Sequence, residues 1–454
     1  MGGLELNSSD IVSKRVSLLV LTWPIFAETL LRMLLGNVNV YMIGRQTDKA
    51  VAAVGVATQL ISMLIMVYGI VSVGTAIMVS QTLGAGKRKE AAKVVNIAII
   101  FNFCFGVILS IVFVVCGKWL LMIMNLPPEL MQYALPYLRI VGGISFTQAI
   151  LATMAAIARN YGQTKAPMAV AIGMNIINVT ANYIVVFRPF GIPDFGVRGI
   201  AVSVGISQSL GVLVMFFLLF KYLKLGLKFH IPKPFPFDIL KNILNIGIPG
   251  AGSSLSYNIS QLVGTYIITL LGTQALTTRT YMQNIINILA MLGMAIAQAN
   301  QIMIGHLVGA NEQQKAYKEC FKSLKVAIIC DFTFAFVCFL FRRQLFGIYT
   351  HDQAIIEVGS LLLTISLILE PGRCFNMVLG NALQASGDVK FPVAVGIISC
   401  WTVSVGLSYV LGIHFKLGLP GVYIAFAVDE WTRGLVQLWR WRSGVWKSKR
   451  VVLT

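Results

Sequence analysis

The sequence predicts an all-α polytopic membrane protein with twelve transmembrane helices in two six-helix bundles, and three observations support this. Apolar residues make up 57% of the 454 residues and charged residues only 12%, whereas a soluble domain carries about a quarter charged residues. Apolar stretches of the roughly 20 residues that a helix needs to cross a bilayer recur along the whole chain. The second half of the chain also repeats the first.

Each apolar stretch is assigned as a helix by its length and by the polar or glycine-rich turns beside it. The twelve predicted spans lie at roughly 16–44, 51–83, 94–116, 130–158, 167–188, 197–221, 240–271, 278–308, 321–341, 354–385, 391–414 and 419–440. The opening residues 1–15 are polar and predict a surface segment. No cleavable signal peptide is expected, because the first apolar stretch is too long for one.

A constant offset in residue number relates the two halves, and it carries Pro24 in the first span onto Pro249 in the seventh. With this offset LGAGKRKEAAK (83–93) aligns with VGANEQQKAYK (308–318), and NYGQTKAPMAV (160–170) aligns with ASGDVKFPVAV (385–395). Each half holds six spans, so both copies enter the membrane in the same direction. Parallel repeats of this kind occur in secondary transporters, whose cavity lies between the two bundles.

Three domains follow from the repeat and from a proline- and lysine-rich connection. They are an N-lobe at 1–222, a cytoplasmic linker at 223–238 and a C-lobe at 239–454. We expect a monomer, because two lobes complete a transporter of this architecture within one chain.

The net charge is +19, and the distribution of the basic residues predicts how the chain is oriented in the cell membrane. If the N-terminus is cytoplasmic and the spans alternate, most of the 36 Lys and Arg residues lie on the cytoplasmic side, as in the loop at 87–93 and the C-terminal segment at 440–450. The positive-inside rule therefore places both termini in the cytoplasm. The basic surface suits anionic lipid and requires no nucleic acid.

Several segments, taken in order, resemble the multidrug and toxic compound extrusion (MATE) family. They are Pro24, the loops QTLGAGKRKEAAK, GQTKAP and SGDVKFP, and LEPGRCFNMVLGNALQASGD at 369–388. The resemblance covers essentially the whole chain. It implies a secondary active multidrug efflux transporter that exports amphipathic cationic small molecules by alternating access and contributes to drug resistance. It implies antiport against H⁺ more than Na⁺, with no other cofactor and no bound metal.

The same resemblance makes Asn39 the main candidate for cation coupling. Family members carry an aspartate in the first span, five residues before a glycine, and Asn39 stands five residues before Gly44. The fifth-span positions that carry an acid in some branches are Asn178 and Asn182 here, and the seventh-span glutamate position falls near Tyr257. The chain thus resembles the DinF-like branch more than the NorM-like branch.

The missing acid has two explanations. The chain couples through another acid, or it is an Asp-to-Asn variant at Asn39 with impaired coupling. We favour the variant, because the residues around Asn39 keep the family pattern. Asn has the shape of a protonated Asp but cannot titrate.

Amide and methionine side chains predict a substrate-binding chamber in the N-lobe. Asn175, Asn178 and Asn182 follow i, i+3, i+7 and share one helix face, so they either form a polar chamber or hydrogen-bond between helices. Methionines adapt to varied ligands but also fill cores. The predicted substrate-binding residues are Met33, Asn37, Asn39, Met63, Met66, Met154, Met174, Asn175, Asn178 and Asn182.

Most ionisable residues within the spans have a partner of opposite charge one helical turn away. This spacing predicts structural ion pairs, which we favour over direct coupling: Glu28 with Arg32, Glu370 with Arg373, and Asp429 with Arg433. Asp331 has no arginine within a helical turn, which makes it a second candidate for cation coupling.

Two other functions compete with efflux. A lipid-precursor flippase of the related superfamily would need a strongly basic cavity, yet Arg139 is the only intramembrane arginine that the sequence leaves without a partner. A membrane-embedded enzyme would need clustered catalytic residues. The four histidines are scattered, and no HExxH or GxSxG pattern occurs, so we expect no enzyme.

Overall fold

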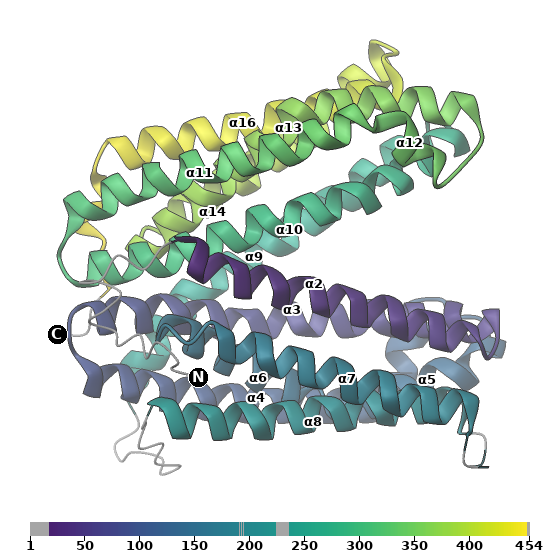
Figure 1. Ribbon diagram of the computed structural model, residues 1–454, viewed down its shortest axis with the longest axis horizontal. Helices are drawn as coiled ribbons and strands as arrows, with labels where there is room; N and C mark the ends of the chain where they lie inside the picture. Colours follow the sequence, from purple (N-terminus) through teal and green to yellow (C-terminus); the bar gives the residue numbers. More distant parts are fainter. Residues whose placement is uncertain (1–17, 190, 192, 194, 224–235, 452–454) are drawn as a thin grey trace. The chain divides into compact units, whose positions relative to one another are not determined.

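The computed structural model describes residues 18–451, apart from 190, 192, 194 and 224–235, and it confirms the predicted all-α fold (Figure 1). The first half contains α2 (Leu18–Gly44), α3 (Asp48–Gly84), α4 (Arg88–Ile123), α5 (Pro128–Gly143), α6 (Phe146–Asn160), α7 (Lys165–Phe187) and α8 (Gly196–Leu223). The second half contains α9 (Phe237–Thr269), α10 (Thr273–Gly309), α11 (Gln313–Leu340), α12 (Arg342–Gly347), α13 (Gln353–Ser386), α14 (Lys390–Ser399), the π-helical η1 (Cys400–Val405), α15 (Gly406–Tyr409), the π-helical η2 (Val410–His414), α16 (Gly418–Arg442) and the 3₁₀-helical η3 (Val445–Ser448).

The helices account for the twelve predicted spans. In the part of the chain that the structure describes, nine helical stretches are long and apolar enough to cross a membrane, and the bent pair α5–α6 makes a tenth. The remaining two spans are α9 and α16. Both are less apolar because they carry polar and charged residues that line a cavity described below.

The duplication seen in the sequence recurs in the helix boundaries. The offset that carries Pro24 onto Pro249 also carries both ends of α3 onto those of α10. The turn before α7 contains Gly162 with φ 82°, and the turn before α14 contains Gly387 with φ 96°. Both turns require a left-handed backbone, which glycine adopts without steric cost. The repeat therefore preserves turn geometry as well as helix length.

The fourth predicted span differs from the sequence prediction because it is broken. Its first part ends at Gly143, its second begins at Phe146, and the two meet at 45°. At the break the Ser145 hydroxyl lies 2.9 Å from the Tyr68 hydroxyl, and the Phe146 amide donates to Ser110 Oγ at 3.1 Å. Neighbouring side chains thus satisfy polar groups at the bend, which makes irregular backbone tolerable at this depth.

The helices group into two compact units. The first unit comprises Ala27–Val79 and Lys87–Gly247, and the second comprises the described residues of 18–26, Ser80–Gly86 and 248–451. Within the first unit α7 packs along α8, and within the second α13 packs along α10, α11 and α16 (Figure 1).

The predicted linker at 223–238 falls almost entirely outside the described residues. Leu223 ends α8 and Phe237 begins α9. The predicted surface segment at 1–15 also falls outside them. The division into lobes at these boundaries stays a prediction.

The C-terminal segment after α16 is held on the second unit by buried contacts. The Trp446 ring stacks on Trp441 with centroids 4.1 Å apart, and both side chains are fully buried. Gln81, at the end of α3, accepts a hydrogen bond from the Val451 amide at 2.7 Å and donates to the Ala385 carbonyl at 2.7 Å. The segment is therefore part of the packed core of this unit.

We expect Trp446→Ala to lower the free energy of unfolding by about 3–5 kcal/mol, because it removes a fully buried indole and leaves a cavity. Thermal unfolding of the purified protein in detergent measures the effect. Trp439→Ala is the control, since Trp439 is 64% exposed. An equal effect of the two substitutions would contradict the packing role of Trp446.

Candidate functional site

Three of the predicted amides meet in the first unit. Asn182 on α7 donates from Nδ2 to Asn39 Oδ1 on α2 at 2.7 Å and to Asn178 Oδ1 at 3.0 Å. Asn178 in turn donates to Ser207 Oγ on α8 at 3.4 Å. Asn178 and Asn182 are fully buried. Asn39, the predicted coupling position, thus accepts a hydrogen bond that joins two helices.

The other predicted substrate-binding residues do not join this amide cluster. Asn37 is exposed on the other side of α2, and Asn175 donates locally to the Ala171 carbonyl at 2.7 Å. Met63 is 51% exposed, whereas Met154 is buried. The remaining methionines, Met33, Met66 and Met174, are partly buried. Three of the ten predicted residues therefore meet in the amide cluster, and a chamber shared by the whole set stays a prediction.

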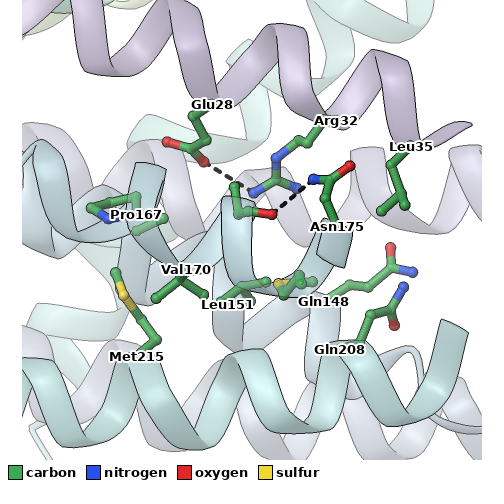
Figure 2. A pocket seen from close by; sticks show the side chains of 13 residues that line it. Glu28, Arg32, Leu35, Gln148, Leu151, Pro167, Val170, Asn175, Gln208 and Met215 are labelled. Atoms are coloured by element: carbon green, nitrogen blue, oxygen red, sulfur yellow. Dashed lines mark hydrogen bonds and ion pairs between the residues drawn. The ribbon is translucent and has the colours of Figure 1, made fainter. Parts of the chain in front are cut away.

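A cavity of about 130 Å³ lies in the first unit (Figure 2). Its wall includes Met174 and Asn175 from the predicted set, and also Gln148 and Gln208, which the sequence did not indicate. At its edge Arg32 Nη2 and Glu28 Oε1 are 3.1 Å apart (Figure 2). This volume is smaller than the roughly 300–1,000 Å³ typical of sites for drug-sized ligands.

Glu28 has a second partner that the sequence did not reveal. Arg159 Nη1, at the end of α6, lies 2.8 Å from Glu28 Oε2. One buried carboxylate therefore faces two arginines, and this cluster carries a surplus of positive charge. Because the two partners are 131 residues apart, helical spacing could not identify the pair.

A larger cavity, of about 560 Å³, lies in the second unit. It runs between α9, α10, α13, the α14–η1 segment and α16. Its wall consists of Ser253, Ser254, Tyr257, Asn258, Gln261, Gln283, Ile286, Asn287, Ala290, Met294, Arg373, Asn376, Met377, Gly396, Cys400, Ser404, Tyr423, Phe426, Asp429, Glu430 and Arg433. Its volume falls within the usual range for a drug-sized ligand.

Asp429 and Glu430 place two carboxylates on the wall of this cavity, in the middle of α16 rather than near a helix end. Asp429 pairs with Arg433 and accepts a hydrogen bond from Ser399 Oγ. Glu430 Oε1 lies 3.0 Å from Arg433 Nη2, and its Oε2 accepts from Asn376 Nδ2 at 2.8 Å. The predicted pair of Asp429 with Arg433 is present, and Glu430 also pairs with Arg433.

A second ion pair joins this cluster from α13. Arg373 Nη1 lies 2.9 Å from Glu370 Oε2, and Arg373 Nε lies 3.8 Å from Glu430 Oε1. Glu370 is fully buried, and its Oε1 has no hydrogen-bond partner among the described residues. A continuous series of charged side chains therefore links α13 to α16.

Asp331 on α11 is buried beside these charged side chains but forms no hydrogen bond or ion pair with any of them. Its Oδ1 has no hydrogen-bond partner in the described part of the protein. A Cβ on Gly293 would lie 3.7 Å from this oxygen and 3.5 Å from Cys374 Sγ. The charged groups that face Asp331 are Glu370 and Arg373.

The acids in this region outnumber the arginines. The four carboxyls are Asp331, Glu370, Asp429 and Glu430, and the two guanidinium groups that form ion pairs among them are Arg373 and Arg433. A buried negative charge is costly without a counter-charge. The surplus carboxyls therefore need protons or a bound cation, and the cavity gives a cation direct access to two of the four.

Comparison with known proteins identifies the chain. A model of the MatE family matches residues 24–184 and 249–410, two segments that begin at the prolines aligned by the repeat, Pro24 and Pro249. The uncharacterized transporter YisQ of Bacillus subtilis is 42% identical over 96% of each chain. A probable multidrug resistance protein NorM of Thermotoga maritima is 26% identical over 99% of this chain and 96% of its own.

Solved structures show the same fold. A MATE protein in a bent conformation has a TM-score of 0.86 at 20% identity, covering 97% of both chains. A transporter of the MOP superfamily from Pyrococcus furiosus has a TM-score of 0.84 at 20% identity, covering 96% of both. The DinF-like assignment stays a prediction. The chain belongs to the MATE family and is a membrane transporter, not an enzyme.

Proposed function

We propose that the protein is a multidrug efflux transporter that exports amphipathic organic cations across the cell membrane in exchange for protons, by alternating access. The observation that carries the proposal is the cavity of about 560 Å³ in the second unit, with four acids in and beside it and only two arginines that form ion pairs with them. The multidrug resistance proteins among the relatives support a small-molecule cargo.

The cavity wall suits a cation that also carries apolar surface. Tyr257, Tyr423 and Phe426 present aromatic rings, whose faces attract cations. Met294 and Met377 add flexible, polarisable side chains that adapt to ligands of different shape. The ligand's positive charge would lie near Asp429 and Glu430, where it offsets part of the surplus negative charge.

Proton coupling follows from the same charge balance. When the cavity is empty, Asp331 carries a proton, because a buried carboxyl that forms no ion pair is more stable when neutral. A bound organic cation makes the ionised form less costly and releases this proton. Proton and cargo then weaken each other's binding by the same factor, as linkage requires. A proton needs one carboxyl oxygen, whereas Na⁺ needs several oxygen ligands, so Asp331 favours H⁺.

Orientation and assembly complete the proposal. Basic residues of the loop at 87–93 and of the C-terminal segment face the cytoplasm by the positive-inside rule, which places both termini there. The protein acts as a monomer. A lipid-precursor flippase is disfavoured, because the wall of the second-unit cavity carries as many carboxylates as guanidinium groups and two further acids lie beside it, so the cavity is not strongly basic.

Purified protein in liposomes tests the function. A fluorescent quaternary ammonium dye is loaded inside, and either a proton gradient or a Na⁺ gradient of equal size is imposed. We expect dye efflux with the proton gradient and its loss with a protonophore. Absence of dye transport under either gradient would contradict the function, and efflux driven by Na⁺ alone would contradict the coupling ion.

Asn39→Asp separates the two explanations of the missing acid. The sequence alone favours the variant, but the four acids of the second unit offer another coupling site. If coupling uses them, the substitution leaves proton-driven efflux within about two-fold, and this is the result we expect. A rise of about ten-fold or more, typical of a restored coupling site, would instead identify this chain as an Asp-to-Asn variant with impaired coupling. Asn178→Asp, in the same amide cluster, shows whether any acid there has the same effect.

A further inference from the structure

Arg279 on α10 is a buried arginine with neutral partners. Its side chain is 9% exposed. It donates from Nη1 to Thr265 Oγ1 at 2.6 Å and from Nη2 to Gln261 Oε1 at 3.3 Å. No carboxylate forms an ion pair with it among the described residues, in contrast to Arg373 and Arg433. A buried guanidinium without an anion is an unusual and costly arrangement.

This arginine lies at one end of the second-unit cavity. It stands one helical turn before Gln283, which lines the wall, and its partner Gln261 lines the wall as well. The hydroxyls of Tyr257 and Tyr423, two further wall residues, lie near the Arg279 side chain. The guanidinium is therefore close to the space that a ligand would fill.

The acids lie toward the other end. Ser253, two helical turns before Gln261 on α9, has its Oγ 3.3 Å from the position of a Cβ on Gly396. One turn after Gly396 on α14, Ser399 donates to Asp429. At about 1.5 Å of rise per residue, the helix from Ser253 to Gln261 is roughly 12 Å long. The wall carboxylates and the Arg279 end of the cavity are thus separated by a distance on the order of 10 Å.

We propose that this cavity selects zwitterions, with the cationic group of the cargo toward Asp429 and Glu430 and an anionic group, such as a carboxylate, at Arg279. The proposal rests on the proposed export of organic cations and narrows the cargo. A carboxylate would give the guanidinium the charge-assisted, planar pairing that Thr265 and Gln261 do not supply. Arg279 is then a specificity-determining residue, and Tyr257 lies midway along α9 between Ser253 and Gln261.

A matched pair of probes tests this selectivity. The first is a naphthalene fluorophore with a quaternary ammonium at one end and a carboxylate at the other, spaced to match the two ends of the cavity. The second is its methyl ester. Binding to the purified protein is measured by fluorescence for the given chain and for Arg279→Gln, Arg279→Lys and Arg342→Gln. Arg279→Gln keeps a donor for the neutral partners, and Arg342 lies outside the cavity wall.

We expect the given chain to bind the carboxylate at least about ten-fold more tightly than the ester, as a hydrogen-bonded charge allows. Arg279→Gln should remove this preference without changing ester binding, Arg279→Lys should keep part of it, and Arg342→Gln should keep all of it. Equal binding of the two probes by the given chain would overturn the proposal, as would an equal loss of both in Arg279→Gln. Failure to bind either probe would contradict the proposed function itself.

Discussion

Asp331→Asn is expected to reduce proton-driven efflux by about ten-fold or more, a factor within the usual range for coupled sites, while cation binding is retained. The amide keeps the size of the protonated acid but cannot release a proton. Because Asp331 is not on the cavity wall, its replacement leaves the contacts of the cargo in place. Liposome efflux and dye binding measure the two quantities separately.

Glu357→Gln is the matched control, since Glu357 is an exposed acid on α13 of the same unit. It should leave both efflux and binding unchanged. Wild-type efflux under a proton gradient in Asp331→Asn would exclude Asp331 as the proton carrier. A parallel loss of efflux and binding would show that the residue shapes the cavity rather than the coupling.

Arg433→Met is expected to lower the free energy of unfolding by about 3–5 kcal/mol, the usual cost of removing one partner of a buried ion pair. Arg433 serves Asp429 and Glu430 together. Its loss leaves only Arg373, 3.8 Å from Glu430, to balance the two carboxylates on the cavity wall. Thermal unfolding in detergent measures the change.

Lys49→Met is the control for charge removal. It breaks the Lys49–Glu129 pair, whose side chains are 63% and 72% exposed, and an exposed pair contributes only about 0–1 kcal/mol. If Arg433→Met were no more destabilising than Lys49→Met, the acids on the wall would be neutral in the folded protein. That result would remove the electrostatic basis for cation binding there.

Most of the fold could be predicted from the sequence, because length, apolarity and repetition determine it. The spans follow from stretches that water cannot solvate, and the constant offset between the halves established their correspondence. The break between Gly143 and Phe146 could not be predicted. It depends on hydrogen bonds with Ser110 and Tyr68, which lie on other helices.

The site was less predictable, and the reason is geometric. Pairs within one helix, such as Glu370 with Arg373, follow from helical periodicity. Contacts between helices have no such signature, so Asn376 at Glu430 and Arg159 at Glu28 were missed. One signal was available for the second-unit cavity: α9 and α16 are less apolar than the other spans. The missing acid at Asn39 favours the N-lobe, and that assignment stays a prediction.

The most direct test of the central claim is proton release on cargo binding. The quaternary ammonium dye is added to purified protein in a weakly buffered detergent solution, and a pH indicator records the protons released. We predict release from the given chain and from Glu357→Gln, with none from Asp331→Asn at the same dye occupancy. Dye binding without proton release in the given chain would contradict coupling through the acids of the second unit.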